Sequence, residues 1–240
     1  MSNRAIVALK WIVFPACLIP LVRLIYYFQQ QNLGADPVNT ITHSTGDWTM
    51  YFLLLSLAIS PVRRLHRSLG WLIRFRRMLG LFAFFYGTLH LSTYVFLYSG
   101  FDVVAAWANL RGLHPAGIAA QWQLVWPTIL DDLEKRKFIQ VGLFAWTILL
   151  ALAVTSPVWI MRKMGGKNWQ RLHRLVYVAA IAGVIHYWWL VKAGVRRPML
   201  DTEILGVLLL ARIVWVLWKR WKQRAKPVPA NSAKSIQSLS

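Results

Sequence analysis

Long apolar stretches separated by short, basic connections dominate this sequence. A transmembrane helix needs about 20 mostly apolar residues to cross a hydrocarbon core about 30 Å thick, and six stretches approach that length. They are residues 8–28, 48–62, 78–98, 138–161, 172–191 and 203–218. The pattern therefore predicts an all-α integral membrane protein, a six-transmembrane-helix bundle contained in a single domain over residues 1–222.

The charged residues predict the orientation of that bundle. The chain has 28 Lys and Arg but only 8 Asp and Glu, and most of the bases lie in connections on one side, whereas all the acids fall on the other. Short loops rich in Lys and Arg stay in the cytoplasm, so both termini are predicted to be cytoplasmic. The polar, Pro- and Ser-bearing segment 223–240 is predicted to be a disordered cytoplasmic tail.

Composition excludes several classes of protein. With 57% hydrophobic and 15% charged residues, the chain differs from an ordinary soluble domain. The net charge of +20 is interpreted as a collar facing anionic membrane lipid, which excludes nucleic acid as a partner. The single cysteine, Cys17, excludes an internal disulfide, covalent haem attachment through two cysteines and an iron–sulfur cluster. We identify no internal repeat.

Three of the six histidines, His90, His173 and His186, fall inside predicted spans, where an ionisable side chain is costly and marks function. At a rise of 1.5 Å per residue, His90 and His186 lie roughly 18 and 21 Å from the inner ends of their helices. Two histidines at one level on different helices suit the two axial positions of a haem iron, an arrangement typical of electron transfer. The alternative for each is a simple hydrogen bond to a neighbouring helix.

A second site is predicted about 20 Å nearer the cytoplasm. His173 precedes His186 by thirteen residues, which places the two on different faces of one ideal helix, so they cannot bind the same iron. The equivalent position in the third span is Arg77, beside Arg76. These arginines could bind haem propionates or a flavin phosphate, or they could belong to the basic collar.

Three blocks of sequence carry a family resemblance: RRMLGLFAFFYGTLHLSTY (76–94), KRKFIQVGLFAWTILLALAVTS (135–156) and NWQRLHRLVYVAAIAGVIHYWWLVK (168–192). They resemble the MsrQ family, formerly YedZ, within the ferric-reductase-like transmembrane proteins. The resemblance implies a multi-pass protein of the bacterial inner membrane with haem b, one or two per chain. In that family, electrons from a cytoplasmic flavin reductase or the quinone pool reach MsrP, a periplasmic molybdopterin subunit that repairs methionine sulfoxide in oxidised envelope proteins.

The resemblance also implies roles for individual residues. By motif match, His90 and His186 would be the axial ligands of the outer haem, and His173 would serve an inner site. The broader ferric reductase pattern has two histidines on each of two helices, whereas the third span here has one. The inner cofactor is therefore left open between a second haem and flavin mononucleotide (FMN), with Arg76 and Arg77 as candidate contacts.

The favoured hypothesis is an electron-transfer subunit that does no bond chemistry on substrate itself. Its partner surface is expected in the outer connection 99–137, where residues 131–137 carry charges of both signs. A stand-alone quinone or ferric reductase would use the same haems. A transporter with a histidine relay is the weaker alternative because the predicted spans contain no Asp or Glu, and a purely structural protein would leave the buried histidines unexplained.

Overall fold

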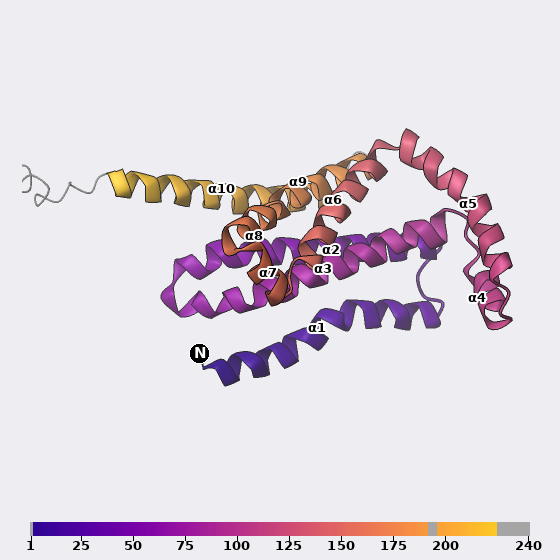
Figure 1. Cartoon of the computed structure of the whole chain (residues 1–240), viewed down its shortest axis with the longest axis horizontal. Coiled ribbons are helices and arrows are strands. Elements are labelled where there is room, and N and C mark those ends of the chain that lie inside the picture. Colours follow the sequence, from indigo (N-terminus) through magenta and orange to yellow (C-terminus); the bar gives the residue numbers. More distant parts are fainter. Residues whose placement is uncertain (1, 192–195, 225–240) are drawn as a thin grey trace, which may run out of the picture.

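The computed structural model of the chain describes residues 2–191 and 196–224, and in this part every regular element is a helix (Figure 1). Three helical segments are long and apolar enough to cross a membrane: Asn3–Gln29, Arg67–Tyr98 and Lys137–Val154. They support the predicted class of membrane protein, whereas the count of six spans and the cytoplasmic termini remain predictions. Most of the predicted tail, from residue 225, lies outside the described residues.

The first two helices extend beyond their predicted spans. Helix α1 (Asn3–Gln29) continues through two prolines, and α2 (Pro37–Leu65) continues through Pro61 rather than ending there. At the start of α2, the Asp36 carboxylate accepts a hydrogen bond from the Asn39 backbone amide at 3.0 Å. Pro37, the first residue of the helix, has no backbone N–H and so leaves no unsatisfied donor. This combination favours a helix start.

A tyrosine from α3 (Ile73–Thr93) supplies hydrogen bonds to backbone groups of α1 that Pro20 leaves without helical partners. Tyr86 is only 1% exposed. Its hydroxyl donates to the Cys17 carbonyl at 2.9 Å and accepts from the Leu21 amide at 3.2 Å. Because a proline inside a helix removes one hydrogen bond and distorts the next, this hydroxyl satisfies groups that the α1 ladder leaves open.

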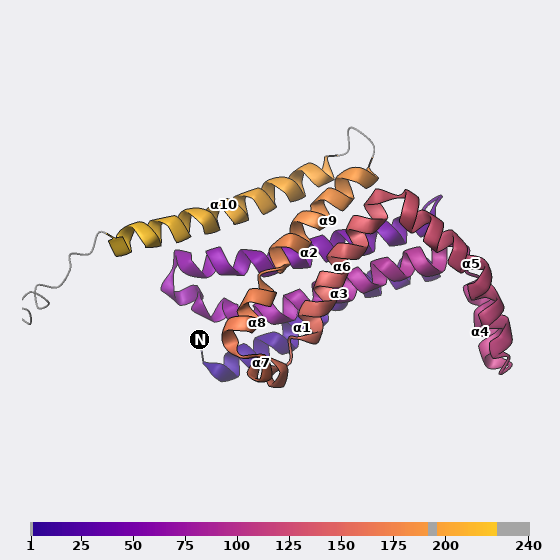
Figure 2. The same ribbon diagram turned by 45° about the horizontal axis from the view of Figure 1, so that its top comes forward.

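Helices α2 and α3 form a hairpin closed by the 3-10 helix η1 (Arg67–Leu72), and the π-helical turn η2 (Tyr94–Tyr98) follows α3. Helices α6 (Lys137–Val154) and α9 (Val176–Leu190) pack against each other and against this hairpin (Figure 2). The main hydrophobic core lies among these four helices, with contributions from α1 and α10.

Two predicted spans are broken in the structure, so the expectation of one helix through each was wrong. The fourth span ends at Val154 because Ser156 and Pro157 start a new short helix, α7 (Val158–Met164). In the fifth, α8 (Gly166–His173) ends before a turn at Arg174 and Leu175, and α9 begins at Val176. His173 and His186 therefore lie in separate helices, and the ideal-helix angle between them does not apply.

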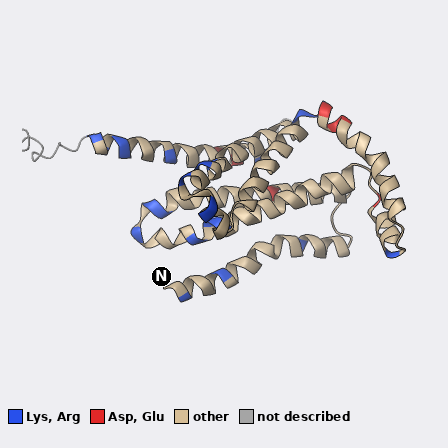
Figure 3. Cartoon of the chain, viewed as in Figure 1, with Lys and Arg blue, Asp and Glu red and all other residues tan. Residues whose placement is uncertain are grey.

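The remaining helices lie at the margins of the bundle. Helices α4 (Val103–Arg111) and α5 (Pro115–Lys135) form within the predicted outer connection 99–137, and α10 (Arg197–Arg224) extends past the sixth span at both ends. Lys and Arg gather around η1, α7, α8 and the C-terminal end of α10, whereas acidic residues are conspicuous at the far end of α5 (Figure 3). The asymmetry of charge seen in the sequence is thus also an asymmetry of the fold.

Candidate functional site

The rings of His90 in α3 and His186 in α9 face each other across the bundle. Their centroids are 6.0 Å apart and their planes are nearly perpendicular, at 84°. Helix geometry alone had predicted a common level for these two side chains. The structure brings them together as neighbours although they are 96 positions apart in the sequence.

Each ring is oriented by a backbone carbonyl of a neighbouring helix. His90 Nδ1 lies 3.0 Å from the Thr42 carbonyl oxygen, and His186 Nδ1 lies 2.7 Å from that of Phe138. Because a carbonyl only accepts, both Nδ1 atoms must carry the proton. Each neutral ring therefore keeps Nε2 as a free lone pair, which is how metal-binding histidines are held in position.

The pair has the spacing that one metal ion between two imidazoles requires. A bond from an imidazole nitrogen to a metal is about 2.0 Å long, so two rings on one ion have centres about 6 Å apart. The observed 6.0 Å matches this value. The donor set, its tautomers and its spacing thus fit the bis-histidine haem that the family resemblance implies.

Two glycines allow the rings to approach the helix backbones. A Cβ atom on Gly46 of α2 would lie 3.2 Å from the His90 ring, and one on Gly142 of α6 would lie only 2.7 Å from His186 Nδ1. The second distance is closer than Cβ contacts occur, so a side chain at Gly142 would displace the ring. Sequence reasoning had singled out neither glycine.

Comparison with known proteins identifies the family. Residues 45–184 match the family described as "Ferric reductase like transmembrane component". A protein of Herminiimonas arsenicoxydans named "Protein-methionine-sulfoxide reductase heme-binding subunit MsrQ" is 43% identical over 227 residues, which cover 93% of each chain. A protein of the same name from Xanthomonas euvesicatoria pv. vesicatoria is 39% identical over 241 residues, covering 95% of this chain and 97% of its own.

The chain belongs to the MsrQ family. The resemblance predicted from the three sequence blocks is thereby confirmed.

In this MsrQ-family chain, His90 and His186 each belong to a segment with the same spacing of carbonyl, glycine and histidine. Each histidine lies 48 positions after the carbonyl that orients it and 44 after the glycine beneath it, so the halves are offset by 96 positions. Other identities share the offset: Ser60-Pro61-Val62 with Ser156-Pro157-Val158, and Gly87 with Gly183. The expectation of no internal repeat was therefore wrong, and this repeat is the signal that would have revealed both glycines.

The predicted inner ligand, His173, has different surroundings. It is the last residue of α8 and stacks on Trp169, with centroids 3.9 Å apart. Its Nε2 lies 3.2 Å from Thr155 Oγ1, and that hydroxyl donates its own proton to the Ala151 carbonyl at 2.6 Å. The hydroxyl must then accept from Nε2–H, so the ring presents no free lone pair on Nε2 in this state.

The two candidate inner arginines differ in burial. Arg76 is half-buried and its charge acts on His173, whereas Arg77 is exposed. Within residues 2–191 and 196–224, no group of three or more His, Cys, Asp or Glu side chains is arranged to hold a metal ion. The structure thus associates Arg76 with the inner position of His173.

A polar cluster adjoins the outer histidine pair, and sequence reasoning missed it. Tyr187, next to His186, donates to Asp47 Oδ1 at 3.2 Å, and Asp47 follows Gly46. Arg197 forms a salt bridge with the same carboxylate. This cluster fastens the start of α10 to α2 and α9 directly beside the histidines. Only the folded chain brings together residues from such distant positions.

Proposed function

We propose that this chain binds haem b through His90 and His186 and passes electrons to a periplasmic methionine sulfoxide reductase subunit, MsrP. The observation that carries the proposal is the facing pair of imidazoles, 6.0 Å apart with both Nδ1 protons held by carbonyls. The names of the two relatives, which describe a haem-binding subunit, support the same assignment. The chain acts as a subunit of an oxidoreductase system rather than as its catalytic component.

The chain's own residues keep the two ligands neutral, oriented and close together. The Thr42 and Phe138 carbonyls fix each ring tautomer, and Gly46 and Gly142 let the rings rest against α2 and α6. When bound, a haem with imidazole on both axial positions supplies reversible one-electron chemistry with no site for substrate. This favours electron transfer over oxygen or substrate chemistry.

We further propose one haem per chain at the outer site. For His173 to ligate a second haem through Nε2, this atom would have to leave Thr155 and lose its proton. An inner site for haem or FMN at His173, Arg76 and Arg77 therefore remains a prediction from the sequence. The positive charges of Arg76 and Arg77 could attract inorganic phosphate or the phosphate of a flavin.

The acceptor is expected at the end of the bundle where α5 meets α6. Lys135 pairs with Asp131 at 2.5 Å and Arg136 with Asp132 at 2.9 Å, and all four side chains belong to one turn of helix and its cap. Tyr94 Oη donates to Asp132 at 3.0 Å, which links this surface to the end of α3. With both termini cytoplasmic, this surface faces the periplasm of a bacterium, and the chain resides in the inner membrane.

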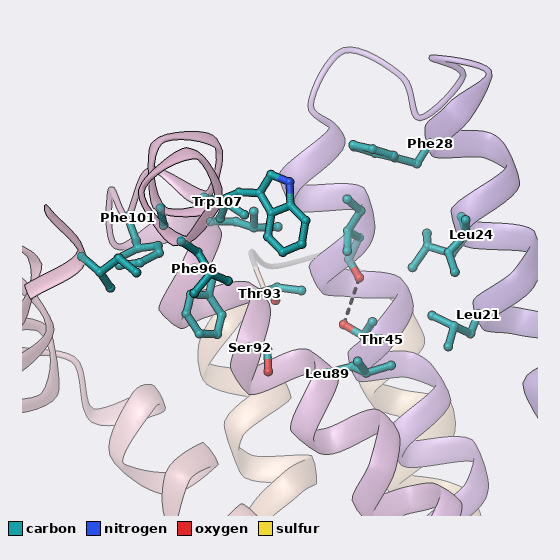
Figure 4. A pocket seen from close by; sticks show the side chains of 17 residues that line it. Leu21, Leu24, Phe28, Thr45, Leu89, Ser92, Thr93, Phe96, Phe101 and Trp107 are labelled. Carbon is teal, nitrogen blue, oxygen red and sulfur yellow. Dashed lines mark hydrogen bonds between the residues drawn. The ribbon is translucent and has the colours of Figure 1, made fainter. Parts of the chain in front are cut away.

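The electron donor is proposed to be the quinone pool or a cytoplasmic flavin reductase. An apolar pocket of about 700 Å³, largely open to the surface, lies between α1, α2, α3 and α4 (Figure 4). Its lining includes Leu89 and Thr93, on either side of His90 in sequence, and the Thr93 hydroxyl donates to the His90 carbonyl at 2.7 Å. Cavities of this size hold small ligands, so a lipid-soluble quinone has a place to bind close to the histidine pair.

The experiment that tests the proposal is an optical spectrum of the detergent-purified protein, oxidised in air and reduced with dithionite, with pyridine haemochrome quantification. We expect a low-spin b-type spectrum that His90→Ala and His186→Ala each abolish. His66→Ala is the control because His66 is exposed and its side chain is hydrogen-bonded to Ser68, two residues away, at 2.7 Å. A colourless wild-type protein after haem supplementation would contradict the proposal and return the histidines to the transporter alternative.

Delivery to MsrP needs a second measurement, because a stand-alone quinone or ferric reductase would have the same spectrum. We expect the dithionite-reduced protein to be reoxidised by purified MsrP with methionine sulfoxide present. Reoxidation by ferric chelates alone, with none by MsrP, would favour the stand-alone reductase.

A further inference from the structure

Five arginines from distant parts of the sequence converge at the basic end of the bundle. Arg63 and Arg64 end α2, Arg76 lies near the start of α3, Arg174 lies between α8 and α9, and Arg212 lies in α10. The charges of Arg63 and Arg76 act on Arg64, and the other four act on Arg212. We refer to these five residues as the arginine cluster.

No acidic side chain neutralises the arginine cluster within the described part of the chain. The three salt bridges found there all involve residues of the other end: Lys135 with Asp131, Arg136 with Asp132, and Arg197 with Asp47. Four of the five arginines are nevertheless half-buried. Gathering like charges away from water is unfavourable unless a counter-ion joins them.

Two polar atoms in or beside the arginine cluster are buried and have no hydrogen-bond partner among the residues that the structure describes. They are Nε of Arg63 and the hydroxyl oxygen of Tyr177. The Arg212 guanidinium lies 4.6 Å from the centre of the Tyr177 ring, so the hydroxyl belongs to the same surroundings. Buried polar groups are nearly always hydrogen-bonded. Both of these atoms carry a proton to donate, which points to a ligand that accepts and is negatively charged.

The side of α10 beyond the cluster is apolar and unpartnered. Leu217 and Trp221 are exposed there, while Trp215 on the same helix is covered by the Arg64 guanidinium, 3.6 Å from its ring centre. The charged group of a ligand in the cluster would thus lie among guanidinium groups, and the rest of the ligand would lie beside the apolar side chains of α10. Basic pockets between helices at the cytoplasmic side of a membrane bind anionic headgroups.

We propose that the arginine cluster, with Tyr177, binds the phosphate group of an anionic phospholipid. Guanidinium groups and phosphate oxygens make strong, charge-assisted hydrogen bonds, and the Arg63 Nε–H and the Tyr177 hydroxyl complete the set of donors. The lipid's chains lie along the exposed face of α10. This site is separate from the outer histidine pair, so a test of lipid binding is independent of haem binding by His90 and His186.

Native mass spectrometry of the full-length protein, with phosphatidylglycerol or phosphatidylcholine added, tests the site. We expect wild-type protein to retain phosphatidylglycerol in preference to phosphatidylcholine, and the double variant Arg63→Gln with Arg212→Gln to lose that preference. The matched control is Arg67→Gln with Arg220→Gln, which removes the same charge from exposed positions at the same end. An equal loss in both double variants would mean that the effect is general surface charge, which overturns the proposal.

Tyr177→Phe removes one hydroxyl with little risk to folding, because that hydroxyl has no hydrogen-bond partner in the described part of the chain. We expect it to weaken phosphatidylglycerol binding by about tenfold, the usual effect of one hydrogen bond to a charged group. Unchanged binding in this variant would remove Tyr177 from the site. Thermal protection by inorganic phosphate or FMN, with no preference for phosphatidylglycerol, would overturn the lipid assignment in favour of a soluble phosphate.

Discussion

Thr155 Oγ1 lies 3.2 Å from Nε2 of His173 and donates its own proton elsewhere, to the Ala151 carbonyl. His173 is therefore engaged as a hydrogen-bond donor and links the end of α8 to the end of α6. The outer histidines have the opposite arrangement, with Nδ1 bonded and Nε2 free. His90 and His186 thus keep Nε2 free, whereas His173 uses Nε2 as a donor and keeps its lone pair on Nδ1.

The first prediction is that His173→Ala keeps one haem per chain. The reason is that the outer pair does not contact His173, whose ring stacks on Trp169 instead. We expect pyridine haemochrome values equal to those of wild type, slower reduction by a cytoplasmic donor, and a loss of stability of about 1 kcal/mol for the lost hydrogen bond. Complete loss of haem would show that the two positions are not separate.

The second prediction concerns the glycine beneath His186. Gly142→Ala places a methyl group 2.7 Å from Nδ1, so the ring must turn or move away from the Phe138 carbonyl. We expect the electron paramagnetic resonance signal to change, with a lower largest g value as the imidazole planes leave their perpendicular arrangement, or haem occupancy to fall several-fold.

Matched alanine variants separate this effect from a general effect on the helices. Gly46→Ala meets His90 at 3.2 Å and should change the same signal less. Gly206→Ala in α10, where a Cβ meets nothing within 4 Å, should leave it unchanged. A Gly142→Ala spectrum identical to wild type would mean that the glycine does not position the ligand.

The third prediction is a pH dependence of stability from Asp201, which precedes the sixth predicted span. Burial and the neighbouring Asp47 carboxylate raise the pKa of Asp201 to about 6, while the charge of Arg197 opposes the rise. Tyr51 of α2 and Tyr187 of α9 also face this carboxyl. Because the native pKa exceeds the unfolded value of about 3.9, the folded protein binds the extra proton.

The contribution of Asp201 to the free energy of unfolding should therefore be greatest below about pH 4 and be lost as the pH rises through about 6. Asp201→Asn mimics the protonated carboxyl, so we expect its unfolding temperature to exceed that of wild type by a few degrees at pH 7. The difference should shrink as the pH is lowered toward about 4, as measured by thermal unfolding in detergent. A constant difference across this range would show that Asp201 does not titrate there.

The fourth prediction tests the surface at the end of α5. Exchanging the charges of Asp131, Asp132, Lys135 and Arg136 keeps their pairing but reverses the field presented to a partner. We expect electron delivery to MsrP to slow by about tenfold, with a strong dependence on salt. Asp102→Lys, at the start of α4, is the control on the same side, and equal slowing there would argue against a specific docking surface.

The fifth prediction tests the cavity beside His90. Ala106 of α4 lines it, and Ala106→Phe would fill part of its volume of about 700 Å³. We expect reduction by a lipid-soluble quinol to slow severalfold, while reduction by dithionite stays unchanged. Ala108→Phe is the control, since residue 108 is in the same helix but does not line the cavity. Equal rates in all three proteins would indicate a donor site elsewhere.

The sequence by itself determined the class of protein and the ligand residues to consider. Apolar length and charge placement depend on transfer to lipid, which is a local property of each segment, and they sufficed to predict a helical membrane protein. The depth of His90 and His186 also followed from local helix geometry, because the rise per residue is constant. The family, too, could be recognised from three blocks of consecutive residues, because their motifs do not depend on contacts between helices.

Only the tertiary structure decided how the side chains meet. The carbonyls of Thr42 and Phe138, the glycines beneath the rings, and the bond that engages His173 depend on packing between helices far apart in sequence. The break after His173 likewise differs from the predicted span 172–191, which was expected to form one helix through Arg174 and Leu175. The hydrophobic pattern indicates which segments are removed from water, whereas the orientation and hydrogen bonding of side chains depend on the residues that the fold places next to them.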